Sequence, residues 1–169
     1  MRIQIVNEND KLIGHKERSQ VHETEDIYRA SCLWIENSIG EILVAQRALT
    51  KSNDPGLWSI AVSGTIDEGE TYESNVVKEA EEELGITDIK PTFVTKFFQP
   101  VPRKMFAAVF SLVYDAPLED FVPQQDEVAQ IAWVTKQDLL GSFTENPEQY
   151  VPSMPVFIDM FVRDSASNV

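Results

Sequence analysis

Apolar and polar residues follow one another along this chain in short segments typical of β-strands. The predicted strands span residues 2–7, 28–36, 41–47, 59–63, 91–99, 104–114 and the end of 121–134. Turn residues separate several of them, with Asn37 to Gly40 closing a hairpin and Asp54-Pro55-Gly56 forming a strong turn signal. Residues 12–22 have no clear period and predict either a further short strand or an irregular arm. Residues 104–114 are apolar at nearly every position, so we expect both faces of that strand to be buried.

Helical patterns flank and interrupt these strands. Thr71 is a good N-cap and Gly85 a good terminating residue, which predicts a helix over residues 72–84. Thr135 precedes a short helix, KQDLLGSF, and Pro155 begins another that spans residues 155–163. Helices placed around a largely β middle favour an α/β fold with helices on two sides of a mixed sheet, although periodicity alone also permits an open α+β fold.

The helix over residues 72–84 has two different faces. Glu79, Glu82 and Glu83 fall within an arc of about 100°, because positions i, i+3 and i+4 share a face. The opposite side carries apolar residues, with Val76 expected at its margin; they are Val77, Ala80 and Leu84. The helix is therefore predicted to bury one face and to present a carboxylate face.

Three like charges on neighbouring turns repel one another unless something compensates them. Lys78 offsets part of the repulsion, and hard oxygen ligands grouped in this way suit Mg²⁺ or Mn²⁺. A solvated acidic helix face is the alternative for any glutamate-rich helix.

The spacing of the surrounding segment favours the metal hypothesis. It reads G-x5-E-x7-K-E-A-x-E-E-x-G-I from Gly64 to Ile86 and resembles the signature of the Nudix hydrolase superfamily. The family usually has arginine where this chain has Lys78, and lysine keeps the charge but lacks the planar fork of arginine. The resemblance implies an α/β/α sandwich with a central mixed β-sheet, formed by a single Nudix domain over residues 1–169 with its motif at 64–86.

The resemblance also implies a reaction, the hydrolysis of a diphosphate linkage in a nucleoside diphosphate derivative or a related small diphosphate, dependent on Mg²⁺ or Mn²⁺. By position, the metal ligands it implies are the three helix glutamates and a backbone carbonyl: Glu79, Glu82, Glu83 and Gly64. Glu70 and Lys78 would support the loop and helix. Glu127 lies where relatives often supply a further acidic ligand or the general base, and its alternative is an ordinary solvated loop carboxylate.

A second resemblance lies outside the motif. Residues 46–58, QRALTKSNDPGLW, and residues 6–22 look like the branch of the superfamily that contains type 1 isopentenyl-diphosphate isomerase and related hydrolases. With the motif, this likeness covers roughly residues 3–86. It implies that Arg18, Arg47 and Lys51 contact the substrate diphosphate; a surface charge is the alternative for Arg18 and Arg47.

The isomerase itself has a cysteine acid and metal-binding histidines at positions that this chain fills differently. Ser63 and Thr65 stand at two of these positions, and Tyr28 aligns near the third. Only His22 could remain of the histidine ligands. Serine is a poorer proton donor than cysteine, so the sequence favours the hydrolase. An isopentenyl-diphosphate isomerase and a catalytically silent diphosphate-binding module remain the alternatives.

Composition limits the partners and the setting. The chain has 169 residues and a net charge of −14, which disfavours long nucleic acid because such a partner requires a basic surface. No signal peptide or membrane-spanning apolar run is seen, so we expect a cytoplasmic protein without a membrane partner. Its expected substrate is a small molecule. Relatives in the family that the chain resembles are often dimers, so a homodimer is possible.

Cys32 and four aromatic residues are expected to lie in the core. The aromatic residues are Tyr28, Trp58, Phe98 and Phe106.

Overall fold

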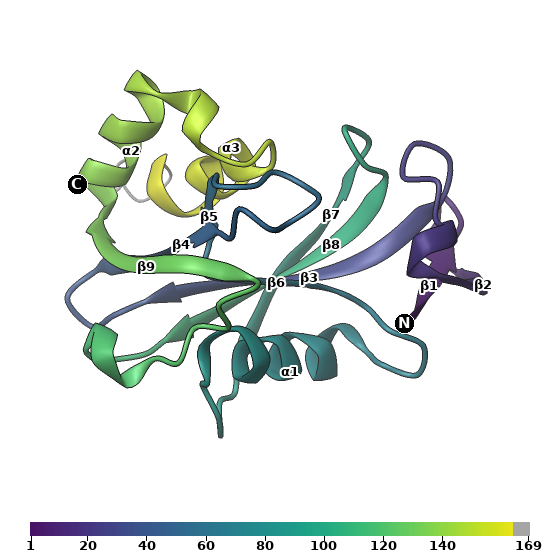
Figure 1. Ribbon diagram of the computed structural model, residues 1–169, viewed down its shortest axis with the longest axis horizontal. Helices are drawn as coiled ribbons and strands as arrows, with labels where there is room; N and C mark the ends of the chain where they lie inside the picture. The colour runs from purple at the N-terminus through teal and green to yellow at the C-terminus, as the bar shows by residue number, and fades with distance from the viewer. Residues whose placement is uncertain (164–169) are drawn as a thin grey trace. The chain divides into compact units, whose positions relative to one another are not determined.

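The computed structural model describes residues 1–163, and its elements are shown in Figure 1. The chain forms two compact units, and strand β3 (Ile27–Glu36) and helix α1 (Tyr72–Leu84) each run from one unit into the other. The first unit comprises Met1–Leu33, Val62–Glu82 and Ile86–Leu112. Within the described residues, the second comprises Trp34–Ala61, Glu83–Gly85 and residues 113–163.

Antiparallel strand pairs and most of helix α1 make up the first unit. Besides β3 and α1, its elements are β1 (Arg2–Val6), β2 (Leu12–Glu17), η1 (Arg18–Gln20), β6 (Val62–Thr65), β7 (Thr92–Gln99) and β8 (Met105–Val113). Strand β1 pairs with β2 and β3, β3 pairs with β6 and β8, and β7 pairs with β8. The β3–β6 register places Ser31 opposite Gly64, so this strand pair delivers the chain directly into the motif loop.

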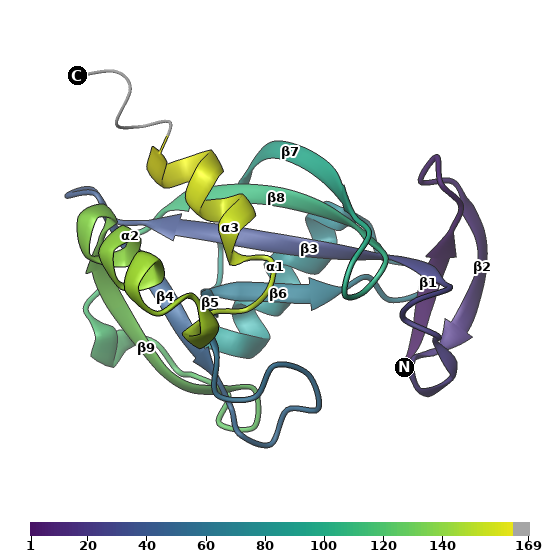
Figure 2. The same cartoon turned by 90° about the horizontal axis from the view of Figure 1, so that it is seen from above.

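Strand β4 lies at the centre of the second unit, where it pairs antiparallel with both β5 and β9. The elements here are β4 (Glu41–Arg47), β5 (Trp58–Ile60), η2 (Leu118–Asp120), β9 (Val128–Thr135), α2 (Lys136–Glu145), η3 (Pro147–Gln149), α3 (Met154–Phe157) and η4 (Ile158–Arg163). Helix α2 lies beside β9, and α3 lies beside β5 (Figure 2).

The predicted strands are confirmed, with two differences in detail. The strand expected over residues 59–63 is two strands, β5 and β6, because the chain changes its pairing partner from β4 to β3 at Ala61. The segment over residues 12–22 contains β2 and the short η1 helix.

The last helix begins at Met154, one residue before Pro155, and continues with π-helical hydrogen bonding from Ile158.

Both ends of helix α1 form as the sequence predicts. At its start, the backbone N–H of Ser74 donates to Oγ1 of Thr71 at 3.1 Å, and the N–H of Thr71 donates to Oγ of Ser74 at 2.9 Å. At its end, Gly85 has φ +72°, a left-handed conformation that favours glycine. The predicted bounds, 72–84, are therefore confirmed.

The buried face of α1 differs from the prediction. Val76, Ala80 and Leu84 are buried, but Val77 is only half-buried. Asn75 is fully buried beside Val76, and burial of these two neighbours turns the packed face towards Val76. A polar side chain thus occupies a core position that the hydrophobic pattern does not reveal.

Of the five side chains expected in the core, two are confirmed as buried, while Trp58 and Phe106 are only half-buried. Cys32 and Tyr28 are buried, as are Ala107–Phe110 in the middle of β8. Phe98 is 42% exposed, so its predicted core position is wrong; it lies on β7, whose only partner among the described strands is β8. Within residues 1–163, no helix is both long and apolar enough to cross a membrane.

A partly buried ion-pair network joins the β1–β2 turn to β3, α1 and β7. Asp10 accepts a hydrogen bond from Nε of Arg29 at 2.7 Å and from the hydroxyl of Tyr72 at 3.2 Å, and it forms an ion pair with Lys96. Burial alone would raise the pKa of Asp10, but the bonds from Lys96 and Arg29 outweigh burial and lower that pKa below 3.8. The ionised carboxylate therefore stabilises the fold.

Replacing Asp10 with asparagine tests this network. Asparagine tolerates the positive φ of Asp10, so the change removes charge with little backbone strain. At pH 7 the free energy of unfolding should fall by about 1–3 kcal/mol. Because the folded-state pKa is depressed, the difference from wild type should shrink as the pH drops below 3.8 through the folded-state pKa. Urea unfolding across this range measures the effect, and a difference that did not change with pH would contradict the assignment.

Candidate functional site

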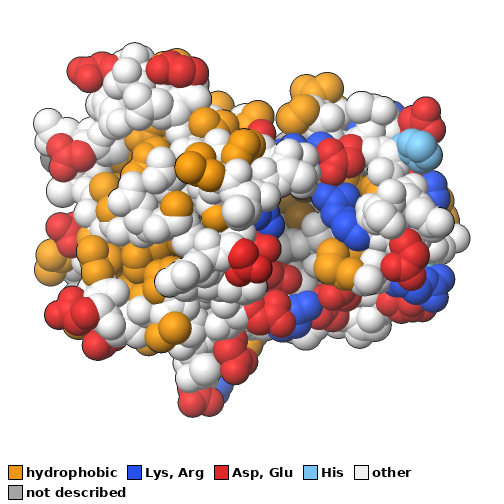
Figure 3. Space-filling model, in the orientation of Figure 1, with side chains coloured by type: hydrophobic (Ala, Val, Ile, Leu, Met, Phe, Trp, Pro, Cys, Tyr) orange, Lys and Arg blue, Asp and Glu red, His pale blue; other side chains and the backbone are white. Residues whose placement is uncertain are grey.

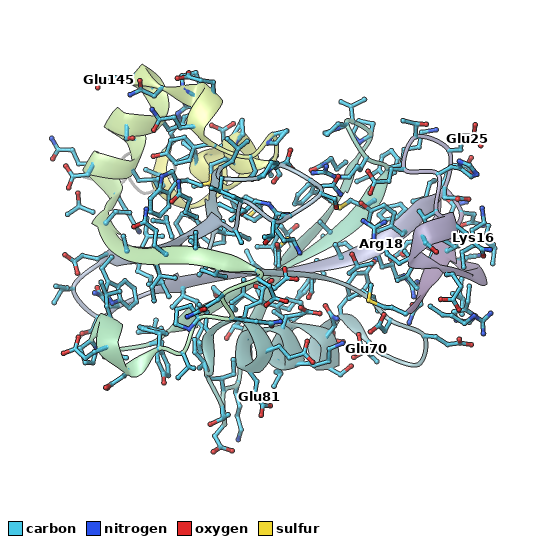
Figure 4. All side chains as sticks on the ribbon, viewed as in Figure 1. Lys16, Arg18, Glu25, Glu70, Glu81 and Glu145 are labelled. Atoms are coloured by element: carbon cyan, nitrogen blue, oxygen red, sulfur yellow. The ribbon has the colours of Figure 1, made fainter. Side chains whose placement is uncertain are left out.

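The motif loop is joined to helix α1 by a group of charges. Nζ of Lys78 lies 2.8 Å from Oε1 of Glu70 and 3.1 Å from Oδ2 of Asp67. The other oxygen of Glu70 accepts the backbone N–H of Asp67 at 3.0 Å. Figure 4 shows Glu70 at the beginning of α1. Glu70 thus bonds both the loop and the helix, and Lys78 makes these contacts although it lacks the arginine fork.

Burial lowers the pKa of Lys78, but the hydrogen bonds that Lys78 donates to Glu70 and Asp67 outweigh burial and raise that pKa above its usual value. Lys78 is therefore a fixed positive charge, 3.9 Å from Oε1 of Glu79. It balances part of the negative charge of the motif.

Gln4 holds the same loop from the other side. Its side-chain amide donates to the carbonyls of Asp67 at 3.0 Å and Glu70 at 2.8 Å, and its Oε1 accepts from Nη1 of Arg29 at 2.7 Å. Gln4 is buried, so strand β1 anchors the motif loop through an amide that is bonded at both ends. The alternating pattern of residues 2–7 predicts the strand but not this contact.

Asn75 is the second residue that the sequence analysis missed. It is fully buried, and its Nδ2 lies 2.7 Å from Oε2 of Glu70, 3.1 Å from the carbonyl of Thr65 and 3.2 Å from Oε1 of Glu79. The hydroxyl of Ser31 donates to its Oδ1 at 2.5 Å. The sequence did contain one signal for Asn75: it lies four residues before Glu79, so both residues lie on one helix face.

Gly64 and Glu79 are in close contact. A Cβ added at Gly64 would lie 2.2 Å from Cδ of Glu79 and 2.4 Å from its Oε1. Real side chains do not approach so closely, so the carboxyl group of Glu79 occupies the space that any larger residue at position 64 would need. The structure therefore brings together two of the predicted metal ligands, a backbone segment and a carboxylate.

The three helix glutamates differ in their environments. The side chain of Glu79 is 15% exposed, Glu83 is half-buried and Glu82 is exposed. Burial raises the pKa of Glu79 to about 7; the charge of Glu82 adds to the increase, while Lys78 opposes it. Among residues 1–163, no three His, Cys, Asp or Glu side chains converge as a ready-made metal cluster.

The second unit contains the other predicted acidic residue and two of the basic ones. Lys51 forms an ion pair with Glu127, and the backbone N–H of Ala48 donates to the Glu127 carbonyl at 2.9 Å. Nε and Nη2 of Arg47 donate to the carbonyl of Asn53 at 3.0 and 2.9 Å. Arg47 thus braces the loop that follows β4, and Lys51 joins this loop to the one that carries Glu127.

The Glu127 loop is also bonded to the last turn of α1. The N–H groups of Gln124 and Val122 donate to the carbonyls of Glu83 at 3.0 Å and Leu84 at 2.9 Å. These bonds satisfy carbonyls that a helix end leaves without intrahelical partners. Glu83 and Glu127 therefore belong to segments that are hydrogen-bonded to each other.

Arg18 lies apart from this group in the chain, in η1 after β2. Its Nη2 is 2.9 Å from Oε1 of Glu23, and its guanidinium stacks 5.2 Å above the centre of the Tyr28 ring. Figure 3 shows acidic and basic side chains interspersed over the part of the chain that carries β1 and β2. Arg18 is thus a paired cation within a mixed-charge surface.

Comparison with known proteins gives the family. Residues 27–158 match the NUDIX domain family and run through both compact units. The Nudix hydrolase PA4841 of Pseudomonas aeruginosa is 35% identical over 130 residues, which cover 76% of this chain and 75% of the relative. An isopentenyl-diphosphate Delta-isomerase of Kocuria rhizophila is 30% identical over 89% of this chain and 87% of its own.

The fold agrees with this relationship. DR0079 of Deinococcus radiodurans, at 23% identity, has a TM-score of 0.83 over 95% of this chain and 99% of that one. The likeness confirms the predicted α/β class, a mixed central sheet with flanking helices. On the family match and the identity to its relatives, the chain belongs to the Nudix hydrolase family.

Proposed function

We propose that this protein hydrolyses a diphosphate linkage in a nucleoside diphosphate derivative or a related small diphosphate, with Mg²⁺ or Mn²⁺ as cofactor. The observation that carries the proposal is the packing of the Glu79 carboxyl against the backbone of Gly64, on the helix that also bears Glu82 and Glu83. Family membership supports hydrolysis as the type of reaction.

The available donors fit a hard divalent cation. Carboxylates of Glu79, Glu82 and Glu83 and the carbonyl of Gly64 are all oxygen ligands, which Mg²⁺ and Mn²⁺ prefer. A bound cation would neutralise phosphate oxygens and activate a water molecule. Glu70 and Lys78 hold the loop that carries Gly64 to the helix that carries the glutamates.

Three basic residues are proposed to bind the substrate diphosphate: Arg18, Arg47 and Lys51. Each has a polar partner in the structure, so its position is fixed before a substrate binds. An anionic diphosphate would compete with Glu127 for the ammonium of Lys51. We propose that Glu127, once separated from that charge, accepts the proton of the attacking water.

A substrate assay tests the proposal. The purified protein is incubated with ADP-ribose, other nucleoside diphosphate derivatives and prenyl diphosphates, with Mg²⁺, with Mn²⁺ or with a chelator. Release of phosphate or a monophosphate from at least one substrate, only with divalent metal, is expected. Metal-dependent ligand binding without turnover on any substrate would favour a silent binding module instead.

An isomerase is the second candidate because a relative of that name is 30% identical. Ser63 stands where the isomerase has its cysteine acid, and the chain's only cysteine, Cys32, lies opposite Ser63 in the β3–β6 pair but is buried. Exchange of solvent protons into isopentenyl diphosphate without phosphate release, abolished by Ser63→Ala, would establish the isomerase. We expect no such exchange, since serine is a weak acid.

A further inference from the structure

We propose that Asn75 is a positioning residue that holds the Glu79 carboxylate in place for the divalent metal, and that Ser31 holds the amide of Asn75 in the required orientation. The inference rests on the proposed function, because it assigns Glu79 as a metal ligand. It adds a buried amide and hydroxyl, neither of which belongs to the fixed positions of the motif.

The surroundings of Asn75 define the orientation of its amide. One end faces three oxygens: the Thr65 carbonyl and the Glu70 carboxylate, which only accept, and an oxygen of the Glu79 carboxyl. The other end receives the hydroxyl of Ser31. The reverse orientation would place the amide oxygen against the Thr65 carbonyl and the Glu70 carboxylate, neither of which donates, so Nδ2 faces the carboxyl groups.

The amide connects the parts of the motif. Nδ2 carries two hydrogens and has three oxygens within 3.2 Å, so its donors are shared among strand β6, the loop carboxylate and the helix carboxylate. Glu79 Oε1 lies closer to this amide, at 3.2 Å, than to the ammonium of Lys78, at 3.9 Å. Asn75 is therefore the nearer donor for orienting Glu79.

Ser31 fixes the amide to the strand pair that presents Gly64. Ser31 is fully buried on β3 and lies opposite Gly64 in the β3–β6 register. Its bond to Asn75 therefore sets the helix against the backbone with which the Glu79 carboxyl is in contact. Through these contacts, both the helix and the carboxylate are held relative to the carbonyl of Gly64.

A buried polar pair could also serve packing alone, and the two roles predict different results. If the pair served packing alone, the metal affinity of each variant would fall only as far as its free energy of unfolding falls. Positioning makes metal affinity depend on the donors of Asn75, because groups that orient metal ligands typically contribute about 10–100-fold in metal affinity. The two quantities must therefore be measured separately.

The experiment compares Asn75→Leu, Ser31→Ala and Asn37→Leu with wild type. Leucine has the same number and branching of side-chain heavy atoms as asparagine but no donor. Asn37 is a matched control, since its Nδ2 donates to Oε2 of Glu41 at 2.9 Å in the turn between β3 and β4. Mn²⁺ affinity is read by electron paramagnetic resonance at a temperature where each variant is folded, and unfolding by urea is measured without metal.

We expect Asn75→Leu to weaken Mn²⁺ binding about 10–100-fold, Ser31→Ala to weaken it less, and Asn37→Leu to lose stability without losing affinity. Wild-type affinity in Asn75→Leu would overturn the inference and leave the proposed function standing. Absence of Mn²⁺ binding by the wild type would overturn both.

A second measurement needs no variant. In the wild-type protein, the side-chain amide resonances of Asn75 should shift when Mg²⁺ is added, whereas those of Asn37 should not. An Asn75 amide that is unmoved while Mg²⁺ binds would overturn the positioning role even if Asn75→Leu does not fold.

Discussion

Replacing Glu82 with glutamine should lower metal-dependent hydrolysis by at least about 100-fold, since loss of a ligand should cost no less than loss of the groups that orient ligands. Glu82 is exposed, so the change should leave the stability of the protein nearly unaltered. Glu82 follows Glu79 by three residues, so the two lie on one face of α1, and the charge of Glu82 adds to the raised pKa of Glu79. The expected defect is therefore one of metal binding, not of folding.

Glu81 provides the matched control. It is the adjacent residue on the same helix, it is also exposed, and Figure 4 shows it pointing away from the ribbon. Glu81→Gln removes the same charge and should retain wild-type turnover. Both variants are assayed on whichever diphosphate the wild type hydrolyses, over a range of Mg²⁺ concentrations. Equal activity of the two variants would remove Glu82 from the metal site.

Helix α1 was predictable because its signals are local. Thr71, Gly85 and the spacing of the glutamates lie within one segment, and the structure reproduces the predicted bounds. Val76 shows the limit of this reasoning. Its burial depends on which residues of other strands face the helix, and periodicity within the helix does not contain that information.

The same limit explains the residues that sequence reasoning missed. Gln4 reaches the motif loop from a strand more than 60 positions earlier in the chain, and Ser31 reaches Asn75 across a separation of 44 residues. Buried amides like these are hydrogen-bonded because the cost of leaving them unpaired is high, but a single sequence does not reveal their partners. Motif spacing predicted the carboxylates and the supporting roles of Glu70 and Lys78, whereas the contacts of Gln4 and Asn75 came only from the fold.

Arg47 illustrates a different limit. The sequence resemblance implies that it contacts the substrate diphosphate, while the structure shows two of its nitrogens bonded to the carbonyl of Asn53. Loop bracing and substrate binding are compatible, because the guanidinium has five donors. Its substrate role remains a proposal that the family likeness supports and local geometry permits.

Replacing Gly64 with alanine should also lower metal-dependent hydrolysis about 100-fold, the cost of a displacement of about 1 Å in a catalytic group. The new Cβ would meet the Glu79 side chain at 2.2–2.4 Å. The atoms that it meets belong to the end of a flexible side chain, so the carboxyl should turn away while the backbone keeps its place. The loss should therefore appear in Mn²⁺ affinity and turnover, with only a small change in the free energy of unfolding.

Gly14→Ala is the control, because a Cβ added there has no neighbour within 4 Å. Glu79→Gln supplies the decisive comparison. If alanine at position 64 acts only by displacing the Glu79 carboxyl, the double variant should be no worse than the more impaired single variant, because both changes remove the same interaction. If the fold-loss of the double variant equals the product of the fold-losses of the two single variants, the two residues act independently. The contact between Gly64 and Glu79 would then have no part in holding the metal.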